Sequence, residues 1–126
     1  FTGYAVDTSS DRDLKTDIEE LDEVEKRVAV KAKGLIRKFK YKIAVESKGD
    51  EAKTHFGIIA QDLEKAFIDE GLDPSKYGIL KKYDVWVGED EDGNRKQETA
   101  EFEGATKKEE MSVRYDELWA FIISAL

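Results

Sequence analysis

The chain has 126 residues, which is enough for one domain. Apolar residues make up 40% of it and charged residues another 40%, so we expect a solid core only if the chain shares that core with partners. No stretch approaches the roughly 18 uninterrupted apolar residues of a membrane span, and we expect no signal peptide. With no cysteine and one histidine, the sequence excludes disulfides, thiol catalysis, thiolate metal sites and histidine-rich metal cages.

Charge distinguishes two regions of the chain. The net charge of −8 argues against nucleic-acid binding by the domain as a whole. Residues 26–45 nevertheless hold eight Lys or Arg and no acid, whereas residues 84–110 hold ten acids and four bases. These regions are either solvated faces, or oppositely charged surfaces that meet between neighbouring subunits or with a tethered partner.

The first predicted helix spans residues 17–33. Thr16 and Glu19 have the spacing of a capping box at its start, and Gly34 is suited to end it. The apolar positions lie three or four residues apart and form one stripe: Ile18, Leu21, Val24 and Val28.

The pattern then changes to that of strands. Apolar residues alternate with lysines over residues 39–45, which predicts a half-buried strand, and a turn follows at residues 47–50. Residues 55–59 indicate a short buried strand. A second helix is expected from Ala60, ended by the glycine and proline at positions 71 and 74.

A charged β-hairpin is predicted at about residues 79–103. Residues 79–87 are rich in β-branched and aromatic residues, and Asp92-Gly93 is a strong hairpin signal. The return strand, at about residues 95–102, has little to bury. The hairpin therefore either projects into solvent or lies against a partner.

Residues 111–113 form a further short predicted strand, and a final helix follows it. That helix is apolar over most of its circumference, which in so small a chain favours burial against other copies. The sequence therefore predicts an α+β domain of three helices with short antiparallel strands and a projecting charged β-hairpin, assembled as a homotrimer.

One residue pair could carry chemistry. Zinc, phosphate and dinucleotide motifs are absent, so we expect no metal and no cofactor. Ser10 and Lys15 could act as nucleophile and base, provided that the lysine is neutral, which burial or a nearby positive charge favours. Residues five apart lie about 140° apart on an α-helix, so the two meet only if Ser10 lies in an extended or turned segment. The other interpretation is a solvated turn.

Three blocks resemble one family. Residues 10–15 (SDRDLK) resemble the S-D-x-x-L-K opening of the self-cleaving intramolecular chaperone domains of bacteriophage tail spikes and fibres, the peptidase S74 family; a related domain occurs in the myelin regulatory factor. Residues 55–63 (HFGIIAQDL) resemble the family signature H-x-G, two aliphatic residues and A-Q. Residues 113–118 (VRYDEL) resemble the V-x-Y-x-x-L that opens its last helix.

The resemblance implies a homotrimer that holds three chains of an upstream fibre or spike in register while they fold, and then cuts itself off. Ser10 would be the nucleophile and Lys15 the general base, with His55 and Gln61 as candidate supporting residues. Residues 1–9 would be the remnant of the upstream fibre with the cleavage segment, and residues 10–126 the chaperone. We expect no nucleic-acid or membrane partner. The chaperone would act in the host cytoplasm during virion assembly, leaving the fibre on the virion tail, and the hairpin would clamp the nascent fibre.

The expected cleavage site comprises Ser9, Ser10 and Asp11, so the bond that is cut is either Ser9–Ser10 or Ser10–Asp11. Attack by the Ser10 hydroxyl on the Ser9 carbonyl passes through a five-membered ring, whereas attack on its own carbonyl needs a strained four-membered ring. Chemistry within one chain therefore favours the Ser9–Ser10 bond. Cleavage of Ser10–Asp11 would need a hydroxyl from Ser9 or from another subunit.

Two other functions fit the same sequence. A non-cleaving trimerisation module would carry the same blocks with an inactive dyad. A soluble α+β domain that binds a partner through its basic strand belongs to a different class, and it would be a monomer.

Overall fold

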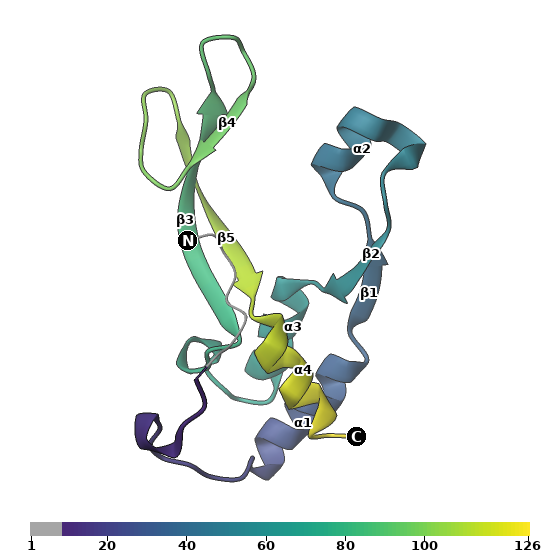
Figure 1. Cartoon of the computed structure of the whole chain (residues 1–126), viewed down its shortest axis with the longest axis vertical. Helices are drawn as coiled ribbons and strands as arrows, with labels where there is room; N and C mark the ends of the chain where they lie inside the picture. Colours follow the sequence, from purple (N-terminus) through teal and green to yellow (C-terminus); the bar gives the residue numbers. More distant parts are fainter. Residues whose placement is uncertain (1–8) are drawn as a thin grey trace.

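The computed structural model describes residues 9–126 and shows a helical body from which two arms project (Figure 1). The body consists of α1 (Glu23–Lys33), α3 (Ala60–Asp69) and α4 (Tyr115–Ile123). We call residues 36–58 the basic arm; it contains β1 (Ile36–Phe39), α2 (Lys42–Lys48) and β2 (His55–Ile58). We call residues 80–113 the ribbon arm; it contains β3 (Leu80–Glu89), β4 (Arg95–Glu98) and β5 (Thr106–Val113). Short 3₁₀ turns lie at Arg12–Leu14 (η1), Gly49–Glu51 (η2) and Pro74–Lys76 (η3).

The core lies in the helical body, where α1, α3 and α4 pack together. Phe67, Leu63, Leu118 and Val28 are the largest fully buried side chains of this cluster. Each of these side chains contributes about 1.5–3 kcal/mol of stability on burial. Within residues 9–126, no helix is long and apolar enough to cross a membrane.

Each arm is held by its own antiparallel sheet. β1 pairs with β2, and β3 lies between β4 and β5 in the ribbon arm. Gly93, with a φ of 81°, forms the turn between β3 and β4, which confirms the predicted hairpin. The strand expected at residues 111–113 is longer than predicted, because β5 pairs with β3 over eight residues from Leu80–Val113 to Val87–Thr106.

The first helix starts six residues later than predicted, and its capping box is a different one. Asp22 accepts a hydrogen bond from the Glu25 amide, and the Glu25 carboxylate accepts one from the Asp22 amide. The chain before it includes Asp17 at a φ of 53°, which an α-helix does not allow. Extending the helix to Ile18 would bury nothing, since that side chain stays 59% exposed.

The strand predicted over residues 39–45 is wrong after Phe39. The chain leaves β1 there and forms α2, which ends at Gly49 with a φ of 58°. The alternating residues find no core to face: Ile43 is 67% exposed. The α+β class with antiparallel sheets is as predicted, but the structure has four α-helices instead of three, and α2 is the additional one.

Tyr115 joins the basic arm to the last helix. Its hydroxyl accepts a hydrogen bond from the Ile58 amide at 3.2 Å and donates one to the Ile58 carbonyl at 3.4 Å. Gly57 makes room for this contact, because a Cβ at that position would lie 2.5 Å from the Tyr115 hydroxyl oxygen. The ribbon arm is fastened close by, where the Arg114 amide donates to the Ile79 carbonyl at 2.8 Å.

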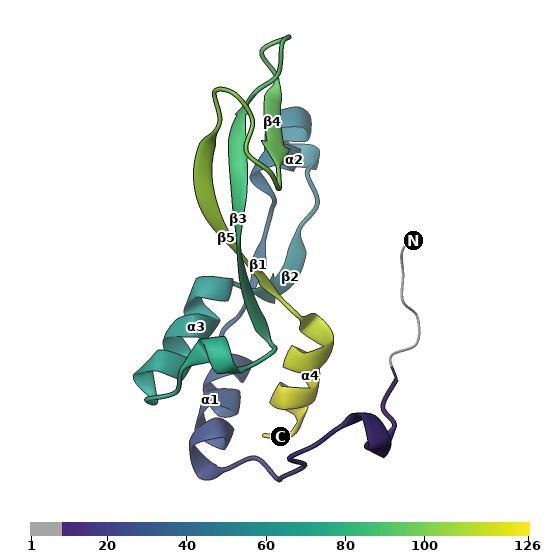
Figure 2. The same cartoon turned by 90° about the vertical axis from the view of Figure 1, so that its left-hand side faces the viewer.

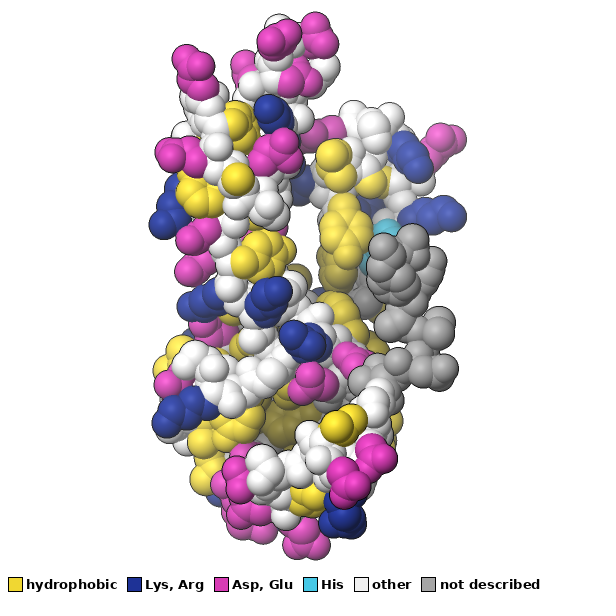
Figure 3. All heavy atoms as spheres, turned by 60° about the vertical axis from the view of Figure 1, so that its left-hand side comes forward, with side chains coloured by type: hydrophobic (Ala, Val, Ile, Leu, Met, Phe, Trp, Pro, Cys, Tyr) yellow, Lys and Arg dark blue, Asp and Glu magenta, His cyan; other side chains and the backbone are white. Residues whose placement is uncertain are grey.

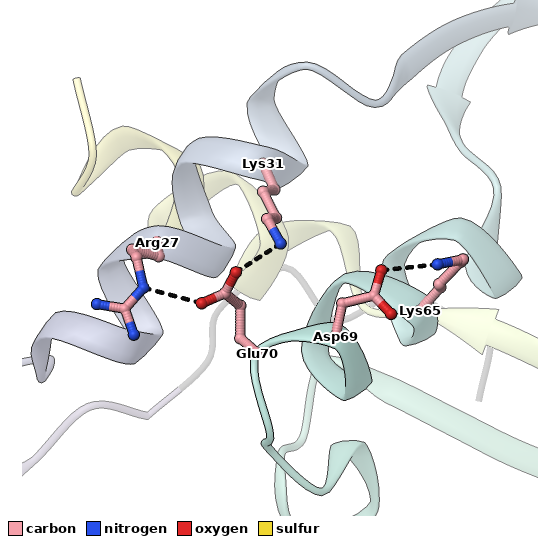
Figure 4. A network of polar contacts seen from close by, with 5 residues as sticks. All are labelled: Arg27, Lys31, Lys65, Asp69 and Glu70. Atoms are coloured by element: carbon pink, nitrogen blue, oxygen red, sulfur yellow. Dashed lines mark hydrogen bonds and ion pairs between the residues drawn. The ribbon is translucent and has the colours of Figure 1, made fainter.

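A carboxylate bridges α1 and the end of α3 (Figure 4). The Glu70 side chain accepts from Arg27 at 2.8 Å and from Lys31 at 2.5 Å, and Lys65 and Asp69 form a separate pair along α3. Hydrogen bonds from Arg27 and Lys31 lower the pKa of Glu70 below its ordinary value of 4.5. The network therefore holds α1 and α3 together most firmly when Glu70 is ionised.

We predict that Gly57→Ala lowers the free energy of unfolding by about 1–3 kcal/mol, because the added methyl overpacks against the Tyr115 hydroxyl. Urea unfolding measures the loss. Gly34→Ala is the matched control, since its Cβ would meet only the Lys31 carbonyl oxygen, at 3.5 Å. Equal losses in the two variants would show that the Tyr115 contact is not tight.

We predict that the stability contributed by Glu70 is present above about pH 4.5 and is lost as the pH falls below that value, because protonation removes its bonds to Arg27 and Lys31. Glu70→Gln should therefore be less stable than the parent near neutral pH and should lose less stability on acidification. Urea unfolding at about pH 6 and about pH 3 measures this. An unchanged pH dependence in Glu70→Gln would contradict the assignment.

Candidate active site

A 3₁₀ turn brings Ser10 and Lys15 together. Asp11 caps this turn, η1, by accepting from the Asp13 amide at 2.9 Å, and the Lys15 amide donates to the Arg12 carbonyl at 3.1 Å. The flanking residues Asp11 and Lys15 have extended backbones. The chain is therefore extended both where it enters the turn and where it leaves it.

The Lys15 ammonium donates a hydrogen bond to the Ser10 hydroxyl oxygen, with an Nζ–Oγ distance of 2.7 Å. The same separation suits the reverse direction, in which the hydroxyl donates to a neutral amine as proton transfer begins. The two side chains therefore meet across a turned segment, the geometry in which the sequence allowed them to meet.

The site is open to water in the single chain. Ser9, Ser10 and every residue of the turn are exposed, and Leu14 is 71% exposed although it is apolar. Figures 1 and 2 place the turn beside the helical body, at the end opposite the tips of both arms. A charged amine is disfavoured in a less polar setting, so a surface that covered this turn would favour a neutral lysine.

His55 and Gln61 do not join Ser10 and Lys15. His55 lies on β2 in the basic arm, where its ring stacks on Phe39 and meets the edge of Tyr41. Gln61 lies in the first turn of α3 and lines a groove of about 460 Å³ at the base of the two arms. Among residues 9–126, no group of three His, Asp or Glu side chains could hold a metal ion.

Sequence reasoning missed a contact that joins the end of η3 to the start of α1. The Tyr77 hydroxyl donates to the Glu25 carboxylate at 2.8 Å, in the capping box where α1 begins. Burial, together with Glu25, raises the pKa of Tyr77 to about 12. No local pattern marks this pair, because 52 residues separate its members.

The comparisons with known proteins agree on one family. The family model described as "Chaperone of endosialidase" (Peptidase_S74) matches residues 10–72, which include the turn, the basic arm and α3. The chain is 38% identical, over 98% of its length, to a probable tail spike protein of Klebsiella phage 0507-KN2-1, and 47% identical over 46% of its length to the tail spike protein of Escherichia virus K5. It spans only about a tenth of these relatives, 11% and 10% of their lengths.

Two solved structures have the same fold. The carboxy-terminal domain of the bacteriophage T5 L-shaped tail fibre with its intramolecular chaperone domain matches 99% of this chain with a TM-score of 0.68 at 23% identity, and the chain covers 30% of it. A crystal structure titled as a novel intramolecular chaperone matches 92% of this chain with a TM-score of 0.68 at 31% identity, and the chain covers 93% of it.

The fold is thus that of the intramolecular chaperone domains of phage tail proteins. The chain belongs to the Peptidase_S74 family of such domains.

Proposed function

We propose that this chain is a trimeric intramolecular chaperone that folds a phage tail fibre or spike and then releases itself by Ser–Lys autoproteolysis at Ser10. The hydrogen bond between the Lys15 amine and the Ser10 hydroxyl is the observation that carries the cleavage proposal. It lies in the first six residues that the family model matches.

In the proposed reaction, the Ser10 Oγ attacks the carbonyl carbon of Ser9 while Lys15 takes the hydroxyl proton. The tetrahedral intermediate collapses as the peptide nitrogen of Ser10 takes a proton from Lys15 and leaves, so an ester joins the Ser9 carbonyl to the Ser10 Oγ. Water then hydrolyses that ester. The products are residues 1–9 ending in a carboxylate and residues 10–126 beginning with a free amine.

Assembly as a trimer is supported by the outer face of α4. Leu118 and Ile122 are buried in the chain's own core, whereas Ile123 and Leu126 remain 63% and 81% exposed. A helix that is apolar on both sides needs cover on both sides. Trimerisation would also raise the local concentration of the three upstream chains, whose long-range β contacts are otherwise slow to form.

The order of events follows from the exposure of the turn. While Ser10 and Lys15 face water, the chain stays uncut. Assembly with the folded fibre covers the turn, and cleavage follows because burial favours a neutral amine as the base. We place this sequence of events in the host cytoplasm, with the fibre remaining on the virion tail.

We predict that the chain, expressed together with its upstream fibre, is cut between Ser9 and Ser10, and that Ser10→Ala stays intact. Lys15→Gln should slow cleavage by about 10²–10⁴-fold, because it removes the general base. Intact-mass spectrometry reports both the rate and the bond. Ser9→Ala is the matched control and should still be cut. A product starting at Asp11, together with an inactive Ser9→Ala, would move the nucleophile to Ser9, and an uncut parent would favour the non-cleaving module.

We predict that Ile123→Asp weakens trimer formation by about a hundredfold while leaving the fold intact, because a charge would be buried between copies. Sedimentation equilibrium measures association, and circular dichroism checks the fold. Ile68→Asp is the matched control, since Ile68 on α3 is 56% exposed and lies outside the proposed interface. A monomeric parent would contradict the trimer and would favour the monomeric partner-binding domain.

A further inference from the structure

The basic arm has an apolar surface that nothing in residues 9–126 covers. Phe56 on β2 is 75% exposed and Ile43 on α2 is 67% exposed, and Tyr41 and Val45 of the same arm are also exposed. A concentration of exposed apolar side chains on so short an arm is typical of an interaction surface.

The same arm carries positive charge without a counter-charge. Residues 36–58 hold six bases and three acids. Its bases form no ion pair within residues 9–126: Arg37, Lys38, Lys40, Lys42, Lys48 and Lys53. The partner of this arm should therefore offer negative charge beside apolar groups.

The end of the ribbon arm has the opposite character. We call residues 89–103 the acidic tip; they hold seven acids and two bases. Figure 3 shows acidic side chains gathered at this end of the molecule. The tip's acids likewise form no ion pair in the described part of the chain. Phe102 supplies an aromatic ring there, with Lys96 4.5 Å from its centre.

The two arms project from the same end of the helical body, and the ribbon arm reaches further. Figures 1 and 2 show β4 beside the level of α2 along the long axis in both views, with the loop before β4 extending beyond it. Two different patches that recognise each other make a head-to-tail contact, and such contacts close into a ring around a rotation axis. Copies arranged around an axis parallel to the arms would bring the tip of each copy to the basic arm of the next.

We propose that the acidic tip of one copy docks on the apolar and basic face of the basic arm of a second copy. The inference rests on the proposed trimer and adds a second contact to it, distant from α4. Three such contacts would tie the arms into a ring above the helical body.

The chain has no cysteine of its own, so a disulfide between two introduced cysteines can test whether the acidic tip docks on the basic arm. Lys42→Cys is placed in one chain and Asp92→Cys in a second chain that differs in mass, and the mixture is oxidised. Docking raises the effective concentration of the two thiols, so we expect about tenfold more 42–92 product between chains than from the control Lys76→Cys with Asp92→Cys. Lys76 is exposed in η3 on the body.

Charge variants test the chemistry of the contact. Changing Lys38, Lys40 and Lys42 to Glu should lower the cross-link between Ser47→Cys in one chain and Asp92→Cys in another by about tenfold. Changing Glu91, Glu101 and Glu103 to Lys in that same variant should restore it, because the charges are then exchanged. High salt should weaken the parental cross-link.

The possible results separate the two proposals. A trimer by sedimentation with no 42–92 product overturns the docking and leaves the chaperone proposal standing. A monomer under all conditions overturns both. A 42–92 disulfide within one chain, or a cross-link from the basic arm to an upstream fibre segment in place of a second copy, also overturns the docking. Binding of a single-stranded oligonucleotide to the basic arm with displacement of the tip would assign the surface to nucleic acid instead.

Discussion

The hydroxyl of Tyr115 joins the last helix of the body to the root of the basic arm, beside the point where the ribbon arm ends. It bonds to both backbone polar groups of Ile58 at the root of the basic arm, one residue after β5 passes into α4. The Tyr115 side chain of α4 thus bonds to backbone groups of β2 that would otherwise need a neighbouring strand as their partner. Gly57 permits this close approach, because a Cβ at that position would lie 2.5 Å from the Tyr115 hydroxyl oxygen.

The helical body has a buried core within one chain, whereas the turn at Ser10 is exposed to water. The body is stable within one chain, since Phe67, Leu63 and Leu118 are fully buried and α1 is bridged to α3 through Glu70. The turn precedes α1 in the chain, and none of its residues is buried. In the proposed mechanism, this separation lets a folded chaperone exist with an inactive dyad until assembly covers it.

A single copy exposes apolar and charged surfaces that proteins normally bury against a partner. The outer face of α4, the apolar side of the basic arm and the unpaired charges of both arms lie in different places along the molecule. Contacts at both ends would make assembly cooperative, because docking the arms then becomes an intramolecular step after the helices associate.

Local sequence determined the features that need only neighbours: the β2–α3 block, the Asp92-Gly93 hairpin and a turn short enough for Ser10 to meet Lys15. It could not determine where α1 begins, because two capping boxes compete and only packing decides between them. Nor could it place α2, since alternation predicts a strand only if one face finds a core. The bonds from Tyr115 to Ile58 and from Tyr77 to Glu25 join residues 57 and 52 apart, and such contacts exist only after the whole chain has packed.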